Sequence, residues 1–595
     1  MKDIRFFYRT VLLIVCAAFY GACTTVTPSF PSNVDYTDGR SVIREIEHGR
    51  SLIAEKPLEA LLRAKRLALY AENTAEVQAL YQQAETAVEK AFAEATESGN
   101  WEEGLRLYRS LTALGKPPAQ WSEEKLAAAQ HALWKEKGFA ALFQDTSKRL
   151  SGVSADGPSM ETVRRMMKGA VTVWVDRGIT IEKGLGRADR MIGSGFFIDP
   201  NGYLITNYHV IQSEVDPEYE GFSRVYVKLP DRSSVRIPAK VIGWDPVFDL
   251  ALLKTEITPD VYFSLGSSED LNTGSRIYAI GSPAGLEQTL TSGIVSAQNR
   301  RFLSLGSVLQ IDAPVNHGSS GGPIIDEAGR VQAIVFAGLE RQEGLNFAIP
   351  VELLRLILPQ LYEGGAVTHA WMTCYGISAA ETPQREGGTE LVYTLPGTSA
   401  ACIPAGTVIT HLNGQPVPSL EALQAALMRL SAGTIVKVSG YAPCKATSSD
   451  VKPDEKGSSK TESSAEKKSD AASFGTGTNG TAERCDWYVQ LEARPEEPAE
   501  QIYRKDSRAR AMLPLYGIYL ENAGGKKSFR ITDVVPGSYA DETGFSAGDY
   551  LEIRSMELQK DQDAVYTQIY TRRRKSAYLD AFMDIWAYLD SPSYF

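Results

Sequence analysis

The sequence has 595 residues, 43% of which are hydrophobic, and its formal net charge is −11. This length predicts about four domains, and the hydrophobic share is enough for ordinary globular cores. The acidic balance argues against nucleic acid as a partner. The six histidines are scattered without the spacing of metal ligands, and no cysteine or carboxylate cluster joins them. We therefore expect neither a metal site nor a cofactor.

The N-terminus has the pattern of a secretory signal. Basic residues precede an apolar run over 11–19, which is too short to span a membrane, and small residues lead to Cys23. The end of this pattern resembles the processing site of bacterial lipoproteins. The resemblance implies removal of a signal peptide over 1–22, a lipid on Cys23 that anchors the protein to a membrane, and a linker over 23–40. The alternative is a signal peptide cleaved nearby, which leaves Cys23 as a free thiol. Both predict an exported protein of the bacterial cell envelope.

Residues 41–150 are rich in Ala, Glu, Leu, Lys and Arg, with apolar residues at helical spacing, which predicts an all-α region. The stretch 99–108 resembles the first helix of a TPR-like hairpin, and the region has room for two or three such hairpins. Two roles stay open: a spacer without specific function, or a docking surface for a partner or for neighbouring subunits. A linker is expected over 151–158.

Three separated segments carry the residue types of acyl-transfer chemistry. Ser320 stands among glycines, where a hydroxyl can project and backbone amides can face an oxyanion. His209 follows a predicted β-hairpin with an Asp-Pro-Asn-Gly turn, and Asp249 precedes an apolar strand. The order His, Asp, Ser is that of the two-barrel trypsin-like proteases. Asp245 and His317 are the other candidates for the catalytic aspartate and histidine. Asp245 precedes a proline and is interpreted as the start of a turn, and His317 is interpreted as a loop residue.

On these residues the chain resembles the HtrA/Deg family of trypsin-like serine proteases with C-terminal PDZ domains. The resemblance implies a protease domain over 160–362, built of two six-stranded antiparallel barrels, and a homotrimer, which is common in the family. Two residues depart from the family pattern, since Ser319 replaces the usual Asn and Asn346 the usual Gly. The matching segments are 193–211, 243–254, 281–285, 291–296, 312–323 and 344–350.

The resemblance also assigns the catalytic roles. Ser320 would attack the scissile carbonyl, with His209 as general base and then general acid, and Asp249 would hold the imidazole in the right tautomer. The backbone amides of Gly318 and Ser320, with Ser319 between them, would form the oxyanion hole.

The substrate pocket is expected to be apolar. In a trypsin-like fold the residue six before the nucleophile lies at the base of the primary pocket, and here it is Pro314, which offers no carboxylate to Arg or Lys. We expect small or medium apolar residues before the cut. Leu345, Asn346 and Phe347 are expected beside the substrate channel.

The C-terminal third resembles two PDZ domains, both α+β, over 366–495 and 510–595. In the first copy Tyr375, Gly376 and Ile377 would form the loop whose amides receive a peptide C-terminal carboxylate, while the peptide adds as a strand. Tyr516, Gly517 and Ile518 repeat this motif in the second copy. The alternative in each copy is an ordinary strand start.

The first PDZ-like domain carries an insertion over 445–483 that has hardly an apolar residue and is predicted to be disordered. Cys444 and Cys485 bracket it, and a disulfide between them fits an oxidising compartment. Cys374 and Cys402 either pair or are simply buried. Four cysteines allow three connectivities, among which the sequence does not choose.

These features predict a lipid-anchored endopeptidase for misfolded or signalling proteins, with PDZ domains that bind chain ends. Two alternatives remain: a binding protein whose protease domain is inactive, and a chaperone or scaffold in which the helices and PDZ domains dominate.

Overall fold

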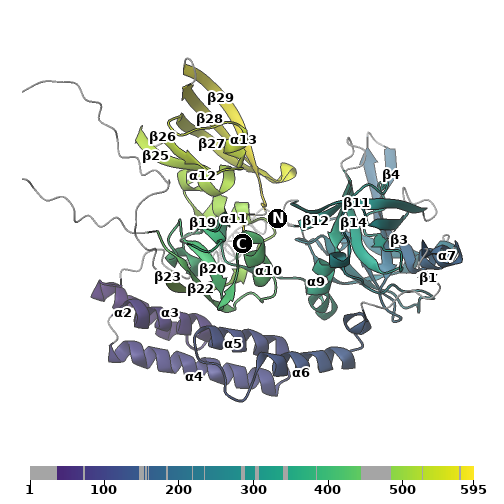
Figure 1. Ribbon diagram of the computed structural model, residues 1–595, viewed down its shortest axis with the longest axis horizontal. Helices are drawn as coiled ribbons and strands as arrows, with labels where there is room; N and C mark the ends of the chain where they lie inside the picture. Colours follow the sequence, from purple (N-terminus) through teal and green to yellow (C-terminus); the bar gives the residue numbers. More distant parts are fainter. Residues whose placement is uncertain are drawn as a thin grey trace, which may run out of the picture.

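The computed structural model describes most of the chain (Figure 1). The described residues are 36–71, 74–145, 153–154, 157–158, 160–182, 185–217, 219–232, 235–282, 289–301, 307–338, 346–382, 385–443, 484–525, 527–574, 578–591 and 593–595. The predicted signal peptide, Cys23 and the insertion over 445–483 lie outside them. No helix within these ranges is both long and apolar enough to cross a bilayer.

The N-terminal region is all-α, as predicted. Each helix packs on the next, and side chains of Asp38, Thr74, Asn100 and Ser122 accept N–H groups at four of the helix starts. A 3₁₀ turn follows at Ala140–Phe143. Figure 1 shows these helices as a layer beneath the first PDZ-like domain. The helices are α2 (Gly39–Leu52), α3 (Pro57–Tyr70), α4 (Ala75–Glu97), α5 (Trp101–Ala113) and α6 (Glu123–Glu136).

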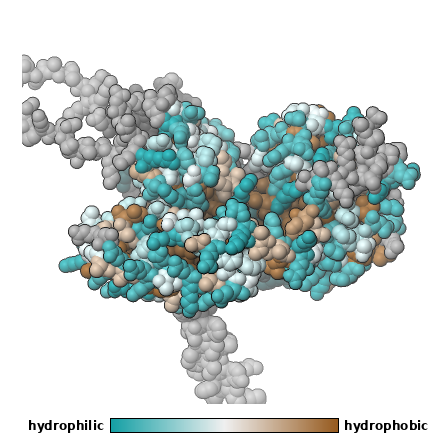
Figure 2. All heavy atoms as spheres, turned by 60° about the horizontal axis from the view of Figure 1, so that its bottom comes forward, coloured by the Kyte–Doolittle hydropathy of each residue, from teal (hydrophilic) through white to brown (hydrophobic). Residues whose placement is uncertain are grey.

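The helical layer is fixed to that domain by buried contacts. The guanidinium of Arg66 donates to the carbonyls of Ser399 and Tyr488, both at 2.6 Å. Ile435 of the domain is fully buried in the same hydrophobic cluster as Leu107 of α5. In Figure 2 this face of the molecule is mostly hydrophilic, with hydrophobic side chains where the helical layer and the protease domain meet.

The protease domain contains the two predicted barrels. The second is a closed barrel of six strands in the order β10-β11-β12-β15-β14-β13. The first is an eight-stranded sheet in the order β16-β8-β9-β5-β4-β3-β6-β7, rather than the expected six, because two-residue strands add to both edges. Its strands are β3 (Ala170–Glu182), β4 (Leu185–Phe197), β5 (Tyr203–Thr206), β6 (Arg224–Lys228), β7 (Ile237–Pro238), β8 (Lys240–Asp245), β9 (Leu250–Lys254) and β16 (Gly365–Ala366).

Three helices accompany the barrels: α7 (Met160–Gly169), α8 (Tyr208–Val215) and α9 (Val351–Glu363). The strands of the second barrel are β10 (Arg276–Gly281), β11 (Thr289–Arg301), β12 (Ser307–Ile311), β13 (Pro323–Ile325), β14 (Val331–Gly338) and β15 (Asn346–Pro350).

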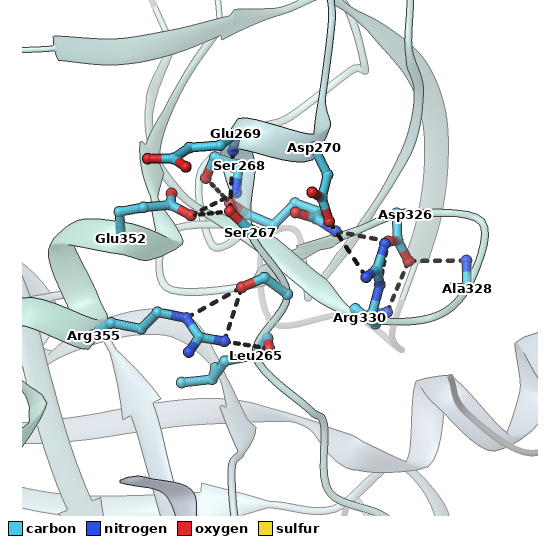
Figure 3. Close-up of polar contacts among 12 residues, drawn as sticks. Leu265, Ser267, Ser268, Glu269, Asp270, Asp326, Ala328, Arg330, Glu352 and Arg355 are labelled. Carbon is cyan, nitrogen blue, oxygen red and sulfur yellow. Dashed lines mark hydrogen bonds and ion pairs between the residues drawn. The ribbon is translucent and has the colours of Figure 1, made fainter. Parts of the chain in front are cut away.

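Polar contacts tie the connection between the barrels to α9 and to the second barrel (Figure 3). Glu352 accepts two hydrogen bonds of 2.8 Å from Ser267 and Ser268 in this connection, and Arg355 donates to carbonyls of the same segment. Arg330 and Asp326 form an ion pair of 2.7 Å on the neighbouring hairpin. These contacts hold the two barrels in one orientation, which a cleft between them requires.

The first PDZ-like domain has a sheet in the order β18-β19-β20-β22-β23, with α10 (Leu420–Leu427) packed against β18. The strands β22 and β23 are antiparallel neighbours, so the insertion leaves and re-enters the sheet at the same end. The strands are β17 (Ala370–Trp371), β18 (Cys374–Ala379), β19 (Gly388–Thr394), β20 (Val408–Leu412), β21 (Gln415–Pro416), β22 (Ile435–Tyr441), β23 (Arg484–Gln490) and β24 (Glu492–Ala493).

The second PDZ-like domain is an antiparallel sheet of five strands in sequence order, covered by α12 (Arg508–Tyr516). It begins before the predicted boundary at 510, because α11 (Pro498–Lys505) packs on α12 and on β28. The remaining elements are β25 (Ile518–Gly525), β26 (Ser528–Val534), α13 (Tyr539–Glu542), β27 (Tyr550–Gln559), β28 (Ala564–Arg574) and β29 (Tyr578–Tyr588).

Candidate active site

The fold brings His209 and Asp249 together. The strands β5 and β9 are antiparallel neighbours, so the end of β5 lies beside the start of β9. His209 lies in the first turn of α8, just after β5, and Asp249 directly precedes β9. One carboxylate oxygen of Asp249 accepts from His209 Nδ1 at 2.7 Å, and the other accepts from the His209 backbone N–H at 2.8 Å.

This pairing fixes the tautomer of the histidine. With the Nδ1 proton donated to Asp249, Nε2 is left as the acceptor for a hydroxyl proton. Asp249 has a positive φ of 51°, a conformation in which Asp is one of the commoner non-glycine residues. The side chain of Asn207 donates to the Asp249 carbonyl at 2.7 Å and so helps to hold this backbone.

The pKa of His209 lies above its ordinary value. Burial lowers the pKa, because it disfavours the imidazolium, but the hydrogen bond and the negative charge of Asp249 together raise it by more. The imidazole is thus poised to take a proton and to keep it while a leaving group forms.

Asp245 has a different task, as predicted. One oxygen of its buried carboxylate accepts the N–H groups of Val247 and Phe248, which makes it the start of a turn. The other contacts His369 Nε2 at 2.8 Å, in the segment that leads to the first PDZ-like domain. His317 is exposed in its loop.

The loop that carries Ser320 packs against β4 and the start of α8. The N–H of Ser194 donates to the Ser320 carbonyl at 2.7 Å, and the Ser194 hydroxyl donates to the Gly318 carbonyl at 2.6 Å. Gly321 has φ of +84°, and a Cβ there would lie 2.3 Å from the Ser194 carbonyl oxygen and 2.9 Å from the backbone nitrogen of Asn207. Only glycine fits, and this close approach brings the loop to a point two residues before His209.

The hydroxyl of Ser320 is directed to the Phe336 carbonyl, at 3.5 Å. Within the described part of the chain it has no hydrogen bond to His209. Such bonds are often absent without substrate and form in the complex.

Two backbone donors are available beside the nucleophile. Gly318 has φ of +95°, and among the described residues neither its N–H nor that of Ser320 donates to an acceptor. The N–H of Ser319 donates to the Asn316 carbonyl at 2.9 Å. Of the three residues predicted for the oxyanion hole, Ser319 therefore has its amide engaged elsewhere.

Comparison with known proteins identifies the family of the chain. Residues 193–334 match the model of a trypsin-like peptidase domain, residues 499–589 that of a TP0546 family PDZ domain, and residues 40–133 a domain of unknown function (DUF8517). A probable periplasmic serine endoprotease, DegP-like, of Ectopseudomonas mendocina is 32% identical over 337 residues, which cover 53% of this chain and 68% of that protein. The chain belongs to the HtrA/Deg family.

A second protein with the same description, from Pseudomonas fluorescens, is 34% identical over 282 residues, or 44% of this chain and 56% of that protein. A solved structure described as the HtrA-type protease AlgW with decapeptide is 22% identical, with a TM-score of 0.42, and covers 56% of this chain and 98% of that one. The chain therefore covers 56% of the length of one of these curated relatives and 68% of the length of the other.

The residues predicted for the substrate pocket lie in different settings. Pro314 is exposed, and its carbonyl accepts from Thr291 at 2.9 Å. The Asn346 side chain donates to the Ala313 carbonyl at 2.9 Å, so it is held against the segment that carries Pro314. Phe347 is buried in the core of the protease domain. Leu345 lies outside the described residues.

The residues predicted for the carboxylate loops do not lie in loops of the PDZ-like domains, and their role in peptide binding stays a prediction. Tyr375, Gly376 and Ile377 lie within β18, not in a loop, because they pair with β19 along their length. Residues 372–373 connect β17 to this strand. In the second copy Tyr516 ends α12, and the Gly517 N–H caps that helix by donating to the Leu513 carbonyl at 2.8 Å.

The structure tests only some of the predictions about the cysteines. Cys374 and Cys402 are free thiols, and burial raises the pKa of Cys374. They do not pair. Cys444 lies outside the described residues, so its disulfide with Cys485 stays a prediction.

Sequence reasoning missed two groups of residues that shape the sites. Ser194 stands out in the sequence only as part of a motif, although its position between two glycines indicates a residue packed against another backbone. Residues 372–373 were missed because this connection places Thr373 at φ of +63°, where a glycine would have given the signal.

Proposed function

We propose that the protein is a serine endopeptidase of the bacterial cell envelope that cleaves misfolded or regulatory proteins. The observation that carries this proposal is the 2.7 Å hydrogen bond between His209 Nδ1 and Asp249, beside a nucleophile loop packed on the same helix start. The family membership supports the reaction class.

In the proposed reaction, Ser320 Oγ attacks the scissile carbonyl and its proton passes to His209 Nε2. The oxyanion is received by the N–H groups of Gly318 and Ser320, each typically worth about 3 kcal/mol. His209 then gives the proton to the leaving amine, which leaves an ester on Ser320. Water, deprotonated by His209, hydrolyses that ester and returns the proton to Ser320.

The cellular setting is part of the proposal. Relatives described as periplasmic support export, and the N-terminal pattern supports a lipid on Cys23 that holds the enzyme at a membrane. A trimer is proposed from the family alone. The PDZ-like domains would bind the ends of protein chains and bring them to the cleft.

A fluorophosphonate probe tests the catalytic proposal directly. The purified protein is expected to be labelled on Ser320, with the labelled peptide identified by mass spectrometry, and to degrade casein. Ser320→Ala should abolish both signals, whereas Ser307→Ala, at an exposed position of β12, should leave both unchanged. If the probe does not label the wild-type protein, and if the Ser320→Ala variant binds clients as well as the wild type does, the protein is instead a scaffold or chaperone.

The specificity of the pocket needs a separate test. Because Pro314 brings no carboxylate to the pocket, cleavage of a peptide library should occur after small or medium apolar residues. Cleavage after Arg or Lys would contradict this.

A further inference from the structure

The hairpin of β3 and β4 extends from the protease domain, away from the helical layer (Figure 1). Within the described residues, β6 pairs with β3 only as far as Asp176, and beyond it β3 and β4 pair with each other alone. Ile179 and Ile181 of β3 are 74% and 78% exposed, and Leu185 at the start of β4 is 67% exposed. Single exposed apolar residues are normal, but several large ones on a projecting hairpin mark a contact surface.

The strand register places the two isoleucines on one face of the hairpin. Ile179 lies opposite Ala188, and Ile181 lies opposite Gly186. Residues directly opposite each other in an antiparallel pair share a face of the sheet. This face therefore carries no polar side chain at these four positions.

The same face becomes charged nearer the body of the domain. Arg190 follows Gly186 and Ala188 at a spacing of two residues along β4, so its side chain lies on their face. It lies opposite Asp176, and Trp174 precedes Asp176 by two residues on β3. The bulge in β3 between Asp176 and the isoleucines leaves β4 regular, so the apolar and the charged parts are continuous on one face.

Three cations gather around the ring of Trp174. Lys228 Nζ lies 4.0 Å from the ring centre, and the guanidinium carbons of Arg236 and Arg190 lie at 4.8 and 4.9 Å. We call these three residues the basic cluster. Arg236 pairs with Asp176 at 3.6 Å, whereas Arg190 and Lys228 form no ion pair within the described part of the chain.

The basic cluster attracts an anionic partner. Burial, and then the positive charges of Arg236 and Arg190, lower the pKa of Lys228. Like charges held this close repel one another, and an anion beside them relieves the repulsion. The chain as a whole has a net charge of −11, so the cluster differs in sign from most of the molecule.

The spacing of the apolar and basic parts suits a lipid surface. A strand rises about 3.3 Å per residue, so Ala188 lies about 7 Å and Gly186 about 13 Å beyond Arg190. Elements that bind at a membrane surface bury their apolar side chains about 5–10 Å deep, near the start of the acyl chains. Basic residues and tryptophan prefer the level of the headgroups. The hairpin presents these residue types in the same order.

The charge also separates a lipid surface from a second copy of the chain. A symmetric contact between two such faces would bring the same three cations of each copy together. Like charges across an interface oppose association. A membrane that contains anionic lipids instead offers negative charge directly above an apolar layer.

We propose that the β3–β4 hairpin binds the surface of a membrane that contains anionic lipids, with Ile179 and Ile181 among the acyl chains and the basic cluster at the lipid phosphates. Insertion is shallow, because the outer edges of the hairpin carry N–H and C=O groups that need water or headgroups. The proposal goes beyond the proposed function, since it uses neither the catalytic residues nor a lipid on Cys23.

Sedimentation with vesicles tests the proposal. The protein is the predicted mature chain, residues 23–595, with Cys23→Ser so that no lipid is attached. It should bind vesicles of phosphatidylcholine and phosphatidylglycerol in equal parts at least about tenfold more tightly than vesicles of phosphatidylcholine alone, since each cation near an anionic surface contributes about fivefold. Equal binding to both vesicles would overturn the role of the basic cluster.

A double variant tests the apolar part. Ile179→Ser together with Ile181→Ser should weaken binding to the anionic vesicles at least about tenfold. The matched control, Ile43→Ser together with Phe582→Ser, removes two exposed apolar side chains far from the hairpin and should leave binding unchanged. Equal binding by the double variant and the unchanged chain would overturn the proposal.

Two further measurements define the partner. Arg190→Gln should weaken binding to the anionic vesicles about fivefold and leave binding to the neutral ones unchanged. If the double variant alters the oligomeric state in sedimentation velocity but not vesicle binding, the face is an interface between copies and the proposal is wrong. Fluorophosphonate labelling of Ser320 should be the same in all these variants, and it reports on catalysis separately, so either proposal can fail alone.

Discussion

The proposed catalytic cleft and the groove between β18 and α10 of the first PDZ-like domain both present backbone N–H groups at or next to a residue with positive φ, Gly318 or Thr373. They differ in whether these N–H groups have acceptors. In the cleft, the N–H groups of Gly318 and Ser320 donate to no acceptor within the described residues. In the groove, Cys374 and Gly376 both donate to residues 593–595. A substitution in the cleft should therefore change a rate, whereas a substitution in the groove should change how firmly residues 593–595 are held on β18.

The largest effect is expected at the Asp249 carboxylate. Asp249→Asn replaces an acceptor with an amide that cannot hold the Nδ1–H tautomer of His209, and kcat/KM should fall about 10⁴-fold. Steady-state hydrolysis of a fluorogenic peptide measures the loss, and Asp260→Asn, at an exposed position, is the control. A loss below tenfold would mean that Asp249 does not orient the histidine.

The pH dependence of the cleft is the next largest effect. Only neutral His209 can accept the Ser320 proton, so kcat/KM should rise with pH and level off above the pKa of the imidazole. Burial lowers this pKa and Asp249 raises it by more, so the midpoint should lie above 6.5, with an approximately tenfold fall per pH unit below it. In Asp249→Asn the midpoint should move to lower pH, because the burial remains and the charge is gone. A profile that is flat from pH 5 to 8 would contradict the role of His209.

The residues of the cleft could be predicted from sequence because each lies beside a local signal. Ser320 stands among glycines that the packing demands, and Asp249 and His209 flank strands that the apolar pattern reveals. The extra strands β7 and β16 could not be predicted, since two residues carry no periodicity and their pairing is decided by the neighbouring edge. The direction of the Ser320 hydroxyl is likewise set by a distant carbonyl, that of Phe336.

The groove shows where a short motif misleads. The sequence Tyr-Gly-Ile occurs at 375–377 and at 516–518, yet the first copy is a strand and the second is a helix end followed by a strand. The difference comes from the residues before it: Ser507 caps a helix that runs into Gly517, whose φ of +79° ends it. The pairing between residues 593–595 and β18 joins segments more than 200 positions apart in the sequence, and no local sequence pattern predicts it.

A smaller effect in the cleft should come from Ser194, which acts through the nucleophile loop. Its hydroxyl donates to the Gly318 carbonyl and accepts the Ser282 N–H at 2.9 Å, so it holds the peptide between Gly318 and Ser319, which connects the two proposed oxyanion donors. Ser194→Ala should lower kcat about tenfold, less than the loss of an oxyanion donor itself, with KM changed less than twofold. Equal changes in kcat and KM, or a fall in labelling that follows unfolding alone, would show that Ser194 only supports the fold. Ser307→Ala is the control.

The smallest effect is expected at Tyr594, whose hydroxyl donates to the Pro514 carbonyl at 3.1 Å while residues 593–595 pair with β18. Tyr594→Phe removes the hydrogen bond to Pro514 and leaves a buried carbonyl without it, which should weaken docking of residues 593–595 by about 1 kcal/mol. Hydrogen exchange of the Cys374 and Gly376 N–H groups, which donate to this segment, should then be about fivefold faster than in the unchanged chain. Tyr588→Phe, at a residue that is 59% exposed, should have no effect. Unchanged exchange of these two N–H groups in Tyr594→Phe would show that the hydroxyl does not help to hold the segment.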